Sequence, residues 1–453
     1  MNENVYEKYS KKRLNDAFEF CEGYKEYLSK AKSEREVIIE TVKLAKENGF
    51  VDIKEYVDGN KKLKPGDKIY AINMDKAMIL AVIGKENLEQ GLNIVGSHID
   101  SPRLDLKSTP LYEDDNICLF DTHYYGGIKK YQWTALPLAL HGVVVKKDGT
   151  KINLCIGENE TDPVFGISDL LPHLDTEKRN EAVTGEELNI IAGTIPDSKA
   201  SKNKVKENIL NILKEKGIEK DDLFSSEIEA VPAGKARDFG LDKSMIMGYG
   251  QDDRVCAYTS IKAILNTKSP NRTSICLLVD KEEIGSDGAT GMKSMFFENF
   301  VADLILLASS YSDLKVRHCL KNSKMISSDV TAGYDPNRPT PFNKETDAHL
   351  GRGIAFCKYT GSKGKSGASD ANPEYIAQIR QILDNNNIFY QASEMGKVEA
   401  GGGGTISKLM AIYNLDVIDA GVPVISMHAP WEITAKVDIY ETYETYNAFY
   451  KFM

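Results

Sequence analysis

Two adjacent glutamates stand where a strongly apolar run of the sequence ends. Residues 275–279 are apolar, and Asp280-Lys281-Glu282-Glu283 follow them directly. Such a run predicts a buried strand of an α/β sheet, and these sheets bind ligands at the carboxyl ends of their strands. Because neighbouring side chains of an extended chain point in opposite directions, one carboxylate can bind a ligand while the other faces a water molecule. The ordinary alternative is a pair of solvated charges in a loop.

Three other segments place metal-binding residue types directly after predicted strands. His98, Asp329 and His428 follow the predicted strands 92–96, 324–327 and 423–426. Each has an ordinary alternative, since Asp is common in turns and His is often a hydrogen-bonded polar residue. Together with the glutamates, these residues put candidate ligands at four strand ends, which favours a site.

A fifth segment, Gly250-Gln251-Asp252-Asp253-Arg254, puts two carboxylates at the start of a helix predicted over residues 254–265. These acids could simply be an N-cap and a first-turn acid, which helices favour. Beside the four strand ends, they become candidate metal ligands as well.

Imidazole nitrogens and carboxylate oxygens in this number suit a pair of zinc-like ions, which leave positions open for water and substrate. We predict that Asp252 bridges the two ions. His98 and Asp329 complete the binding of one ion in this scheme. Glu283 and His428 complete that of the other, at the separation of about 3.5 to 4 Å that is usual for two-metal sites.

Glu282 has no metal ion in this scheme. We predict that it is the general base, which takes a proton from a metal-activated water and passes it to the leaving amine. Asp100 lies two residues beyond His98 and shares its strand face, so its carboxylate can orient the imidazole. The pattern therefore indicates a metal-dependent hydrolase.

The elements that must position these residues follow from the hydrophobic pattern. After residue 250, predicted strands and helices alternate, which indicates an α/β fold with a mixed, mostly parallel sheet covered by helices. Between about residues 109 and 236 the pattern changes to short β-like segments with one charged helix. We expect a catalytic domain over residues 1–107 and 238–453, interrupted by an inserted β-rich domain over residues 108–237.

Composition excludes several classes of protein. The chain has 453 residues, 42% of them hydrophobic, and no apolar run approaches the roughly 18 residues of a membrane helix. Residues 1–13 are charged, unlike a signal peptide. Seven scattered cysteines without a C-x-x-C pair argue against a disulfide framework, and a formal net charge of −10 argues against nucleic-acid binding. We expect a cytoplasmic protein with neither nucleic-acid nor membrane partners.

The candidate site residues also carry a resemblance to a known family. The order and spacing of five segments resemble those of the M18 metalloaminopeptidases, the family of the aspartyl aminopeptidases. The segments are Gly96-Ser97-His98-Ile99-Asp100-Ser101-Pro102-Arg103-Leu104, Tyr125-Gly126-Gly127, Asp280-Lys281-Glu282-Glu283-Ile284-Gly285-Ser286, Ser328-Asp329 with Pro336-Asn337, and Met427-His428. The resemblance extends from about residue 68 to residue 428.

This resemblance implies a zinc exopeptidase-like fold with an inserted dimerisation domain. It implies an enzyme that removes amino-terminal residues from peptides with two zinc ions per subunit, cobalt or manganese being alternatives. The family's ligands and base match the residues assigned above. The resemblance also implies a homo-oligomer, a dodecamer built from dimers, in which a histidine of the inserted domain reaches the neighbouring subunit's site. His173 matches that histidine.

Alternative functions stay open. A deacylase or carboxypeptidase-type hydrolase could use the same metal scaffold, because ligands alone do not say which end of a substrate is held. A non-catalytic scaffold or cargo protein could keep the fold for assembly, although it would have no need of Glu282. The preferred amino-terminal residue is also open, because Ala332 and Asp335 stand where aspartyl-specific members have histidines.

Overall fold

The computed structural model describes residues 4–175 and 182–453. By its internal contacts the chain forms two units. The first comprises Met1–Asp100, Ala236–Met427 and Glu432–Met453, and the second comprises Ser101–Lys235 and His428–Trp431.

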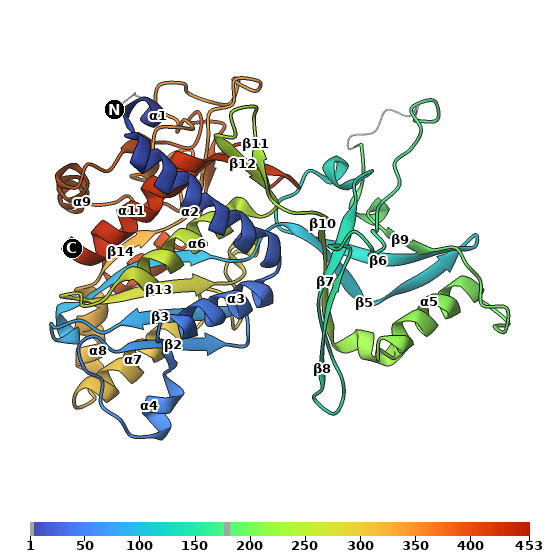
Figure 1. The fold of residues 1–453 in the computed structure, drawn as a ribbon, viewed down its shortest axis with the longest axis horizontal. Coiled ribbons are helices and arrows are strands. Elements are labelled where there is room, and N and C mark those ends of the chain that lie inside the picture. The colour runs from blue at the N-terminus through green and yellow to red at the C-terminus, as the bar shows by residue number, and fades with distance from the viewer. Residues whose placement is uncertain (1–3, 176–181) are drawn as a thin grey trace. The chain divides into compact units, whose positions relative to one another are not determined.

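Within the described residues, nine strands form the mixed sheet of the first unit (Figure 1). In spatial order they are β1 (Val51–Asp52), β2 (Lys68–Asn73), β3 (Ala77–Val82), β13 (Thr273–Val279), β4 (Leu92–His98), β14 (Lys324–Ser327), β20 (Asp416–Gly421), β16 (Ile354–Cys357) and β18 (Tyr390–Ser393). The four strands from β13 to β20 run parallel to one another, whereas β3 pairs with β2 and β13 in antiparallel fashion. The predicted mixed, mostly parallel sheet is confirmed.

The central strands are buried along their whole length because helices cover both faces of the sheet. Every residue of β3, β4 and β13 is buried. Side chains that alternate along one strand enter different cores, as in β3, where Met78 and Leu80 join one core and Ile79 and Ala81 join the other. This continuous burial explains why these strands are mostly apolar and do not alternate with polar residues.

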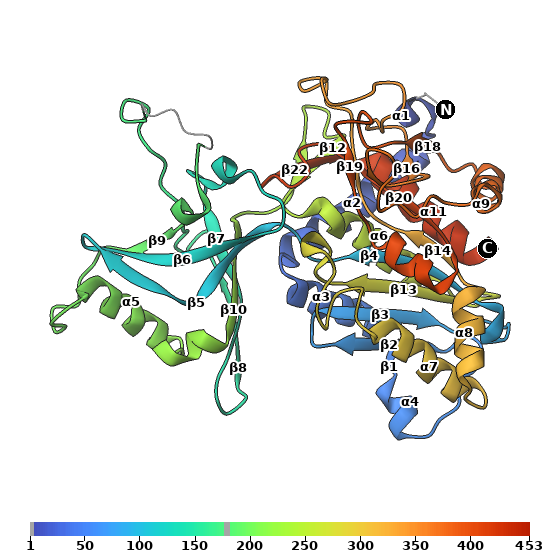
Figure 2. The same cartoon turned by 180° about the vertical axis from the view of Figure 1, so that it is seen from behind.

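Two layers of helices pack on this sheet (Figures 1 and 2). One layer contains α2 (Lys11–Lys30), α3 (Glu34–Glu47), α6 (Gln251–Asn266), α9 (Pro373–Asn385) and α11 (Lys436–Phe452). The other contains α4 (Lys54–Asp58), α7 (Phe296–Ala308), α8 (Asp313–Lys321) and α10 (Ser407–Met410). The short helix α1 (Val5–Lys8) precedes them, and the 3₁₀ helices of this unit are η1 (Leu88–Gln90), η5 (Glu282–Ile284) and η6 (Ala411–Tyr413).

Short strands complete the first unit. They are β11 (Arg237–Phe239), β12 (Met245–Gly248) and β22 (Glu432–Ala435) in one sheet, β15 (Thr331–Ala332) with β21 (Pro423–Val424), and β17 (Gly361–Ser362) with β19 (Gly402–Gly403). Among the described residues, no helix is both long enough and apolar enough to cross a membrane.

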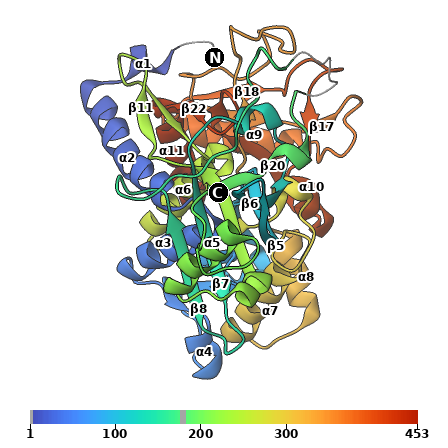
Figure 3. The same ribbon diagram turned by 90° about the vertical axis from the view of Figure 1, so that its right-hand side faces the viewer.

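The second unit is built on an antiparallel sheet (Figure 3). Its strands, in spatial order, are β8 (Lys151–Ile156), β7 (Leu138–Val145), β10 (Ser226–Pro232), β5 (Arg103–Asp114), β6 (Ile117–Tyr125) and β9 (Ile190–Gly193). The helix α5 (Lys204–Glu215) packs against β5, β6 and β9, and the 3₁₀ helices are η2 (Lys130–Trp133), η3 (Gly185–Glu187) and η4 (Lys220–Ser225). This confirms that the inserted part of the chain is rich in β-structure.

Two features of the large sheet differ from the predicted strands. β14 lies between β4 and β20, and the sequence pattern did not predict β20. The strand predicted over residues 423–426 is only the two-residue β21, and it pairs with β15 outside the large sheet. His428 therefore does not follow a strand of the large sheet, whereas His98 is the last residue of β4 and Asp329 follows β14.

Candidate metal centre

The register of three parallel strands brings their carboxyl ends together. β4 lies between β13 and β14, with His98 opposite Val279 of β13 and Gly96 opposite Ser327 of β14. The residues that follow β13 and β14 therefore emerge beside His98. This pairing accounts for the approach of sequence-distant acids to one imidazole.

His98 is the centre of the first group of candidate ligands. Its Nε2 lies 3.1 Å from Oδ1 of Asp252, and ligand atoms of His98, Asp252 and Glu283 lie within 4.8 Å of one another. His98 and Asp252 are buried, and Glu283 is half-buried. These three predicted ligands come from β4, α6 and η5, and the fold brings them together.

Asp253 belongs to a second group, which the sequence analysis did not assign. Ligand atoms of His98, Asp253 and Asp329 also lie within 4.8 Å of one another. Asp252 and Asp253 have non-helical backbone angles at the start of α6, so both carboxylates precede the regular part of the helix. The adjacent Asp-Asp pair was the available signal, but the spacing did not say that both acids face the site.

Asp100 joins the histidine to the glutamates. Its Oδ1 lies 3.2 Å from Nδ1 of His98. The same carboxylate accepts hydrogen bonds from the backbone N–H groups of Glu282 and Glu283, both at 3.1 Å. Because Asp100 is fully buried, this one side chain fixes the imidazole ring and the turn that carries both glutamates.

A further buried acid holds the start of α6. Oε2 of Glu432 accepts the backbone N–H of Asp252 at 3.1 Å, and Gln251 donates its side-chain amide to the backbone oxygen of Glu432 at 2.6 Å. Asp280 has a similar structural role, because its carboxylate accepts hydrogen bonds from the Thr290 hydroxyl and the Lys281 N–H. These hydrogen bonds hold the backbone segments that carry the candidate ligands.

Burial and like charge dominate the electrostatics of the site. Burial would lower the pKa of His98, but hydrogen bonds to Asp100 and Asp252 outweigh it and raise that pKa well above its usual value. Burial raises the pKa of Asp253, and the charge of Asp252 adds to the effect. Burial and the charges of Asp253, Glu282 and Asp252 likewise raise the pKa of Asp329.

This arrangement fits a divalent cation. Asp253 is fully buried, and neither of its carboxylate oxygens has a hydrogen-bond partner within the part of the chain that the structure describes. A cation would supply that partner and would favour the ionised form of each crowded carboxylate. Imidazole with carboxylates is the donor set that zinc accepts in hydrolase sites.

The two remaining predicted histidines lie in the second unit. Nδ1 of His428 lies 2.9 Å from the backbone oxygen of Gly127. A carbonyl only accepts, so this contact places a hydrogen on Nδ1 of His428. His173 is exposed in a turn over residues 172–174. The role of His428 as a ligand and that of His173 in a neighbouring subunit stay predictions.

Comparisons with known proteins agree over nearly the whole chain. A family model described as aminopeptidase I zinc metalloprotease (M18) matches residues 27–450. A probable M18 family aminopeptidase 1 of Clostridium acetobutylicum is 54% identical over 452 residues, which cover 98% of this chain and 97% of the relative. The crystal structure of an M18 family aminopeptidase from Thermotoga maritima has a TM-score of 0.95 and 42% identity, covering 100% of both chains.

A more distant structure shares the fold. It is described as the mApe1 dodecamer of S. cerevisiae, and it has a TM-score of 0.75 with 21% identity, covering 96% of this chain and 95% of its own.

Gly421 of β20 offers a test of how tightly the fold positions Asp329. A Cβ atom at Gly421 would lie 2.1 Å from the backbone oxygen of Asp329 and 2.8 Å from Sγ of Cys256. Gly421→Ala therefore requires a shift of Asp329 or of β20 beside it. Either shift changes the distance between Asp329 and the other candidate ligands, and we expect zinc affinity to fall roughly tenfold or more, as for other supports of metal ligands. Zinc titration against a competing chelator measures the change.

The matched control is Gly364→Ala, because a Cβ atom at Gly364 has no neighbour within 4 Å. It should bind zinc as the wild type does. Equal zinc affinity in the Gly421→Ala variant and the wild type would contradict the dependence of zinc binding on the position of Asp329.

Proposed function

The chain belongs to the M18 aminopeptidase family, and we propose that it hydrolyses the amino-terminal peptide bond of peptides with two zinc ions and a glutamate base. The observation that carries this proposal is the convergence of His98, Asp252 and Glu283, whose ligand atoms lie within 4.8 Å of one another. His98 also belongs to a second group of candidate ligands, with Asp253 and Asp329. Two overlapping groups of ligands support the binding of more than one ion.

We assign the ligands as follows. Asp252 bridges two zinc ions, His98 and Asp329 bind one of them, and Glu283 and His428 bind the other. Asp253 lies against the same cluster, where its charge adds to the field that attracts the cations. Zinc, when bound, supplies a Lewis acid that polarises the peptide carbonyl and lowers the pKa of a water molecule.

Glu282 is the proposed general base. Its backbone N–H is held by Asp100, so the turn that carries Glu282 has a fixed position beside His98. The charge of Glu282 also contributes to the raised pKa of Asp329, which supports its closeness to the cluster. Glu282 accepts a proton from the attacking water and delivers it to the amine that leaves. Glu283, on the same turn, binds a metal ion through its carboxylate in this proposal.

Replacing the two neighbouring glutamates one at a time separates these roles. Glu282→Gln should lower kcat by roughly 10² or more, because the variant has no general base, while zinc content stays at the wild-type value. Glu283→Gln is the matched control at the next residue, and it should lose zinc. Turnover of an aminoacyl anilide and elemental analysis of the same samples measure both effects.

A Glu282→Gln variant that keeps wild-type kcat would remove Glu282 from the mechanism. Zinc loss from Glu282→Gln together with zinc retention by Glu283→Gln would reverse the two assignments.

Substrate chemistry decides between the aminopeptidase and the alternative hydrolases. A panel of aminoacyl anilides with Asp, Glu, Leu and Lys can be compared with N-acyl amino acids and with peptides blocked at the amino terminus. We expect hydrolysis of anilides with a free amino group and none of blocked substrates, and the panel also ranks the amino-terminal residues. Faster hydrolysis of N-acyl amino acids would favour the deacylase. The absence of all hydrolysis in zinc-loaded protein would favour a scaffold.

We further propose that the chain assembles as a homo-oligomer, a dodecamer built from dimers, with residues 108–237 serving in dimerisation. His173 is exposed, and so are Leu170, Leu171 and Leu174 beside it, which gives this segment an apolar surface suited to another subunit. His173 would then contribute to the neighbouring subunit's site. Unchanged activity of His173→Ala in an intact oligomer would exclude that contribution.

A further inference from the structure

The strand pairing beside the proposed metal centre is interrupted where Asp329 lies. Ser327 of β14 pairs with Asp419 of β20, and Thr331 of β15 pairs with Pro423 of β21, so four positions separate both the residues and their partners. The register is therefore the same on the two sides of the interruption. The three residues between Ser327 and Thr331 belong to neither strand, and Asp329 is the middle one.

The hydroxyl of Tyr446 on α11 bridges this interruption. It donates its hydrogen to the backbone oxygen of Ala420 on β20 at 3.0 Å. The Ser328 hydroxyl also forms a hydrogen bond with the Tyr446 hydroxyl. Because the single hydrogen of Tyr446 is already donated to Ala420, Ser328 is the donor in this second bond. Ser328, Tyr446 and Ala420 thus connect the two segments where their backbone pairing is interrupted.

Ser328 is held from both sides. Its backbone N–H donates to the backbone oxygen of Gly96 on β4 at 2.7 Å, while its side chain donates to Tyr446. Ser328 and Tyr446 are buried, so bulk water does not replace either partner when one is removed. Asp329 directly follows Ser328, and its backbone therefore starts from a fixed point beside His98.

We propose that Tyr446 is a positioning residue of the metal centre, which acts through Ser328 to hold Asp329 among the other ligands. This inference rests on the proposed function, in which Asp329 binds zinc. The Tyr446 hydroxyl itself contacts Ala420 and Ser328. Without that hydroxyl, the Ser328 side chain loses its acceptor, and the segment that carries Asp329 shifts to find another. A displaced ligand binds its metal ion more weakly.

Tyr446→Phe tests this role, and Tyr450→Phe is the matched control. Tyr450 lies one turn later on α11, is also buried, and donates its hydroxyl to the backbone oxygen of Ile275 at 2.8 Å. Both variants should unfold at a lower temperature, because each leaves a buried carbonyl without its donor. Only Tyr446→Phe should bind zinc more weakly, roughly tenfold in a chelator competition, and alter the visible spectrum of the cobalt-loaded protein. Equal zinc affinities and identical cobalt spectra of the two variants would overturn the proposal.

Ser328→Ala tests the route from Tyr446 to Asp329, and it is the second variant should Tyr446→Phe fail to fold. It removes the same hydrogen bond from the other side, so zinc affinity should fall by a similar factor. The double variant should bind zinc no more weakly than either single variant, because both changes break one interaction. Losses of affinity that multiply in the double variant would contradict the route through Ser328.

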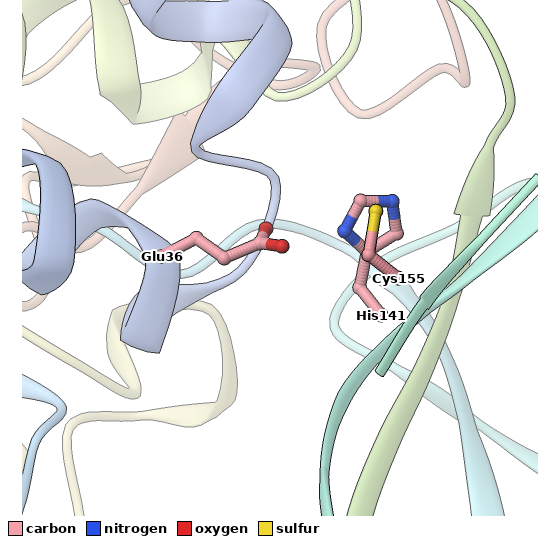
Figure 4. A group of neighbouring side chains, drawn as sticks. All are labelled: Glu36, His141 and Cys155. Carbon is pink, nitrogen blue, oxygen red and sulfur yellow. The ribbon is translucent and has the colours of Figure 1, made fainter. Parts of the chain in front are cut away.

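Zinc or cobalt bound outside the proposed centre must not be counted. Cys155 is the one exposed cysteine among the seven, all of which lie within the described residues. It pairs with His141 across β8 and β7 of the second unit, and Figure 4 shows both side chains. Because a thiol and an imidazole both bind these metals, every variant is prepared in a Cys155→Ser background.

Asp329→Ala separates this inference from the proposed function. It should bind zinc more weakly than Tyr446→Phe does, because it removes the ligand instead of displacing it. Wild-type zinc affinity of Asp329→Ala would overturn the ligand assignment, and the role of Tyr446 with it. Weakened zinc binding by Asp329→Ala, together with wild-type affinity of Tyr446→Phe, would overturn the role of Tyr446 alone.

Discussion

Repulsion among buried acids is the interaction on which the proposed centre depends. Asp252 and Asp253 are almost completely buried, and Asp329 lies against the same imidazole as both. Two like charges 4 Å apart repel by about 4 kcal/mol even at an effective dielectric constant near 20. Burial is the main reason that the pKa values of Asp253 and Asp329 are raised, and this repulsion raises them further, so protonation relieves it when no cation is present. Divalent cations relieve it while the carboxylates stay ionised, so metal binding and the stability of this region are linked.

The order and register of the strands determine which acids lie beside His98. β4 lies between β13 and β14, and the register sets Val279 opposite His98, so the turn with both glutamates begins beside the imidazole. The long inserted segment separates His98 from Asp252 in sequence, yet the first strands and α6 meet again within one unit. Asp100 then ties the histidine to the glutamate turn. Positioning therefore comes from strand order and one buried carboxylate rather than from a local motif.

The sequence predicted the parts of the fold whose burial is continuous. β4, β13 and β14 were predictable because they are short apolar runs that end in candidate ligands. β20 was not predictable, because Asp416 and Asp419 interrupt its apolar pattern. Only the fold shows how these acids are accommodated. Lys324 forms an ion pair with Asp416, and the hydroxyls of Thr405 and Ser407 donate hydrogen bonds to Asp419. The position of His428 after a strand of the large sheet was wrong for the same reason, since β20 occupies that place.

The candidate site was predictable by residue type but not in full. The spacing of His98, Asp252, Glu283 and Asp329 was sufficient to predict their approach, because each follows or begins a regular element. The direction of Asp253 was not, because it depends on non-helical backbone angles at the start of α6 that no periodicity reports.

Anomalous scattering from crystals of the zinc-loaded protein, collected on both sides of the zinc absorption edge, tests the central claim most directly. We expect two zinc peaks in each chain, about 3.5 to 4 Å apart, with the carboxylate of Asp252 between them and the side chain of Glu282 bound to neither. A single peak, or peaks away from His98 and Asp252, would contradict it.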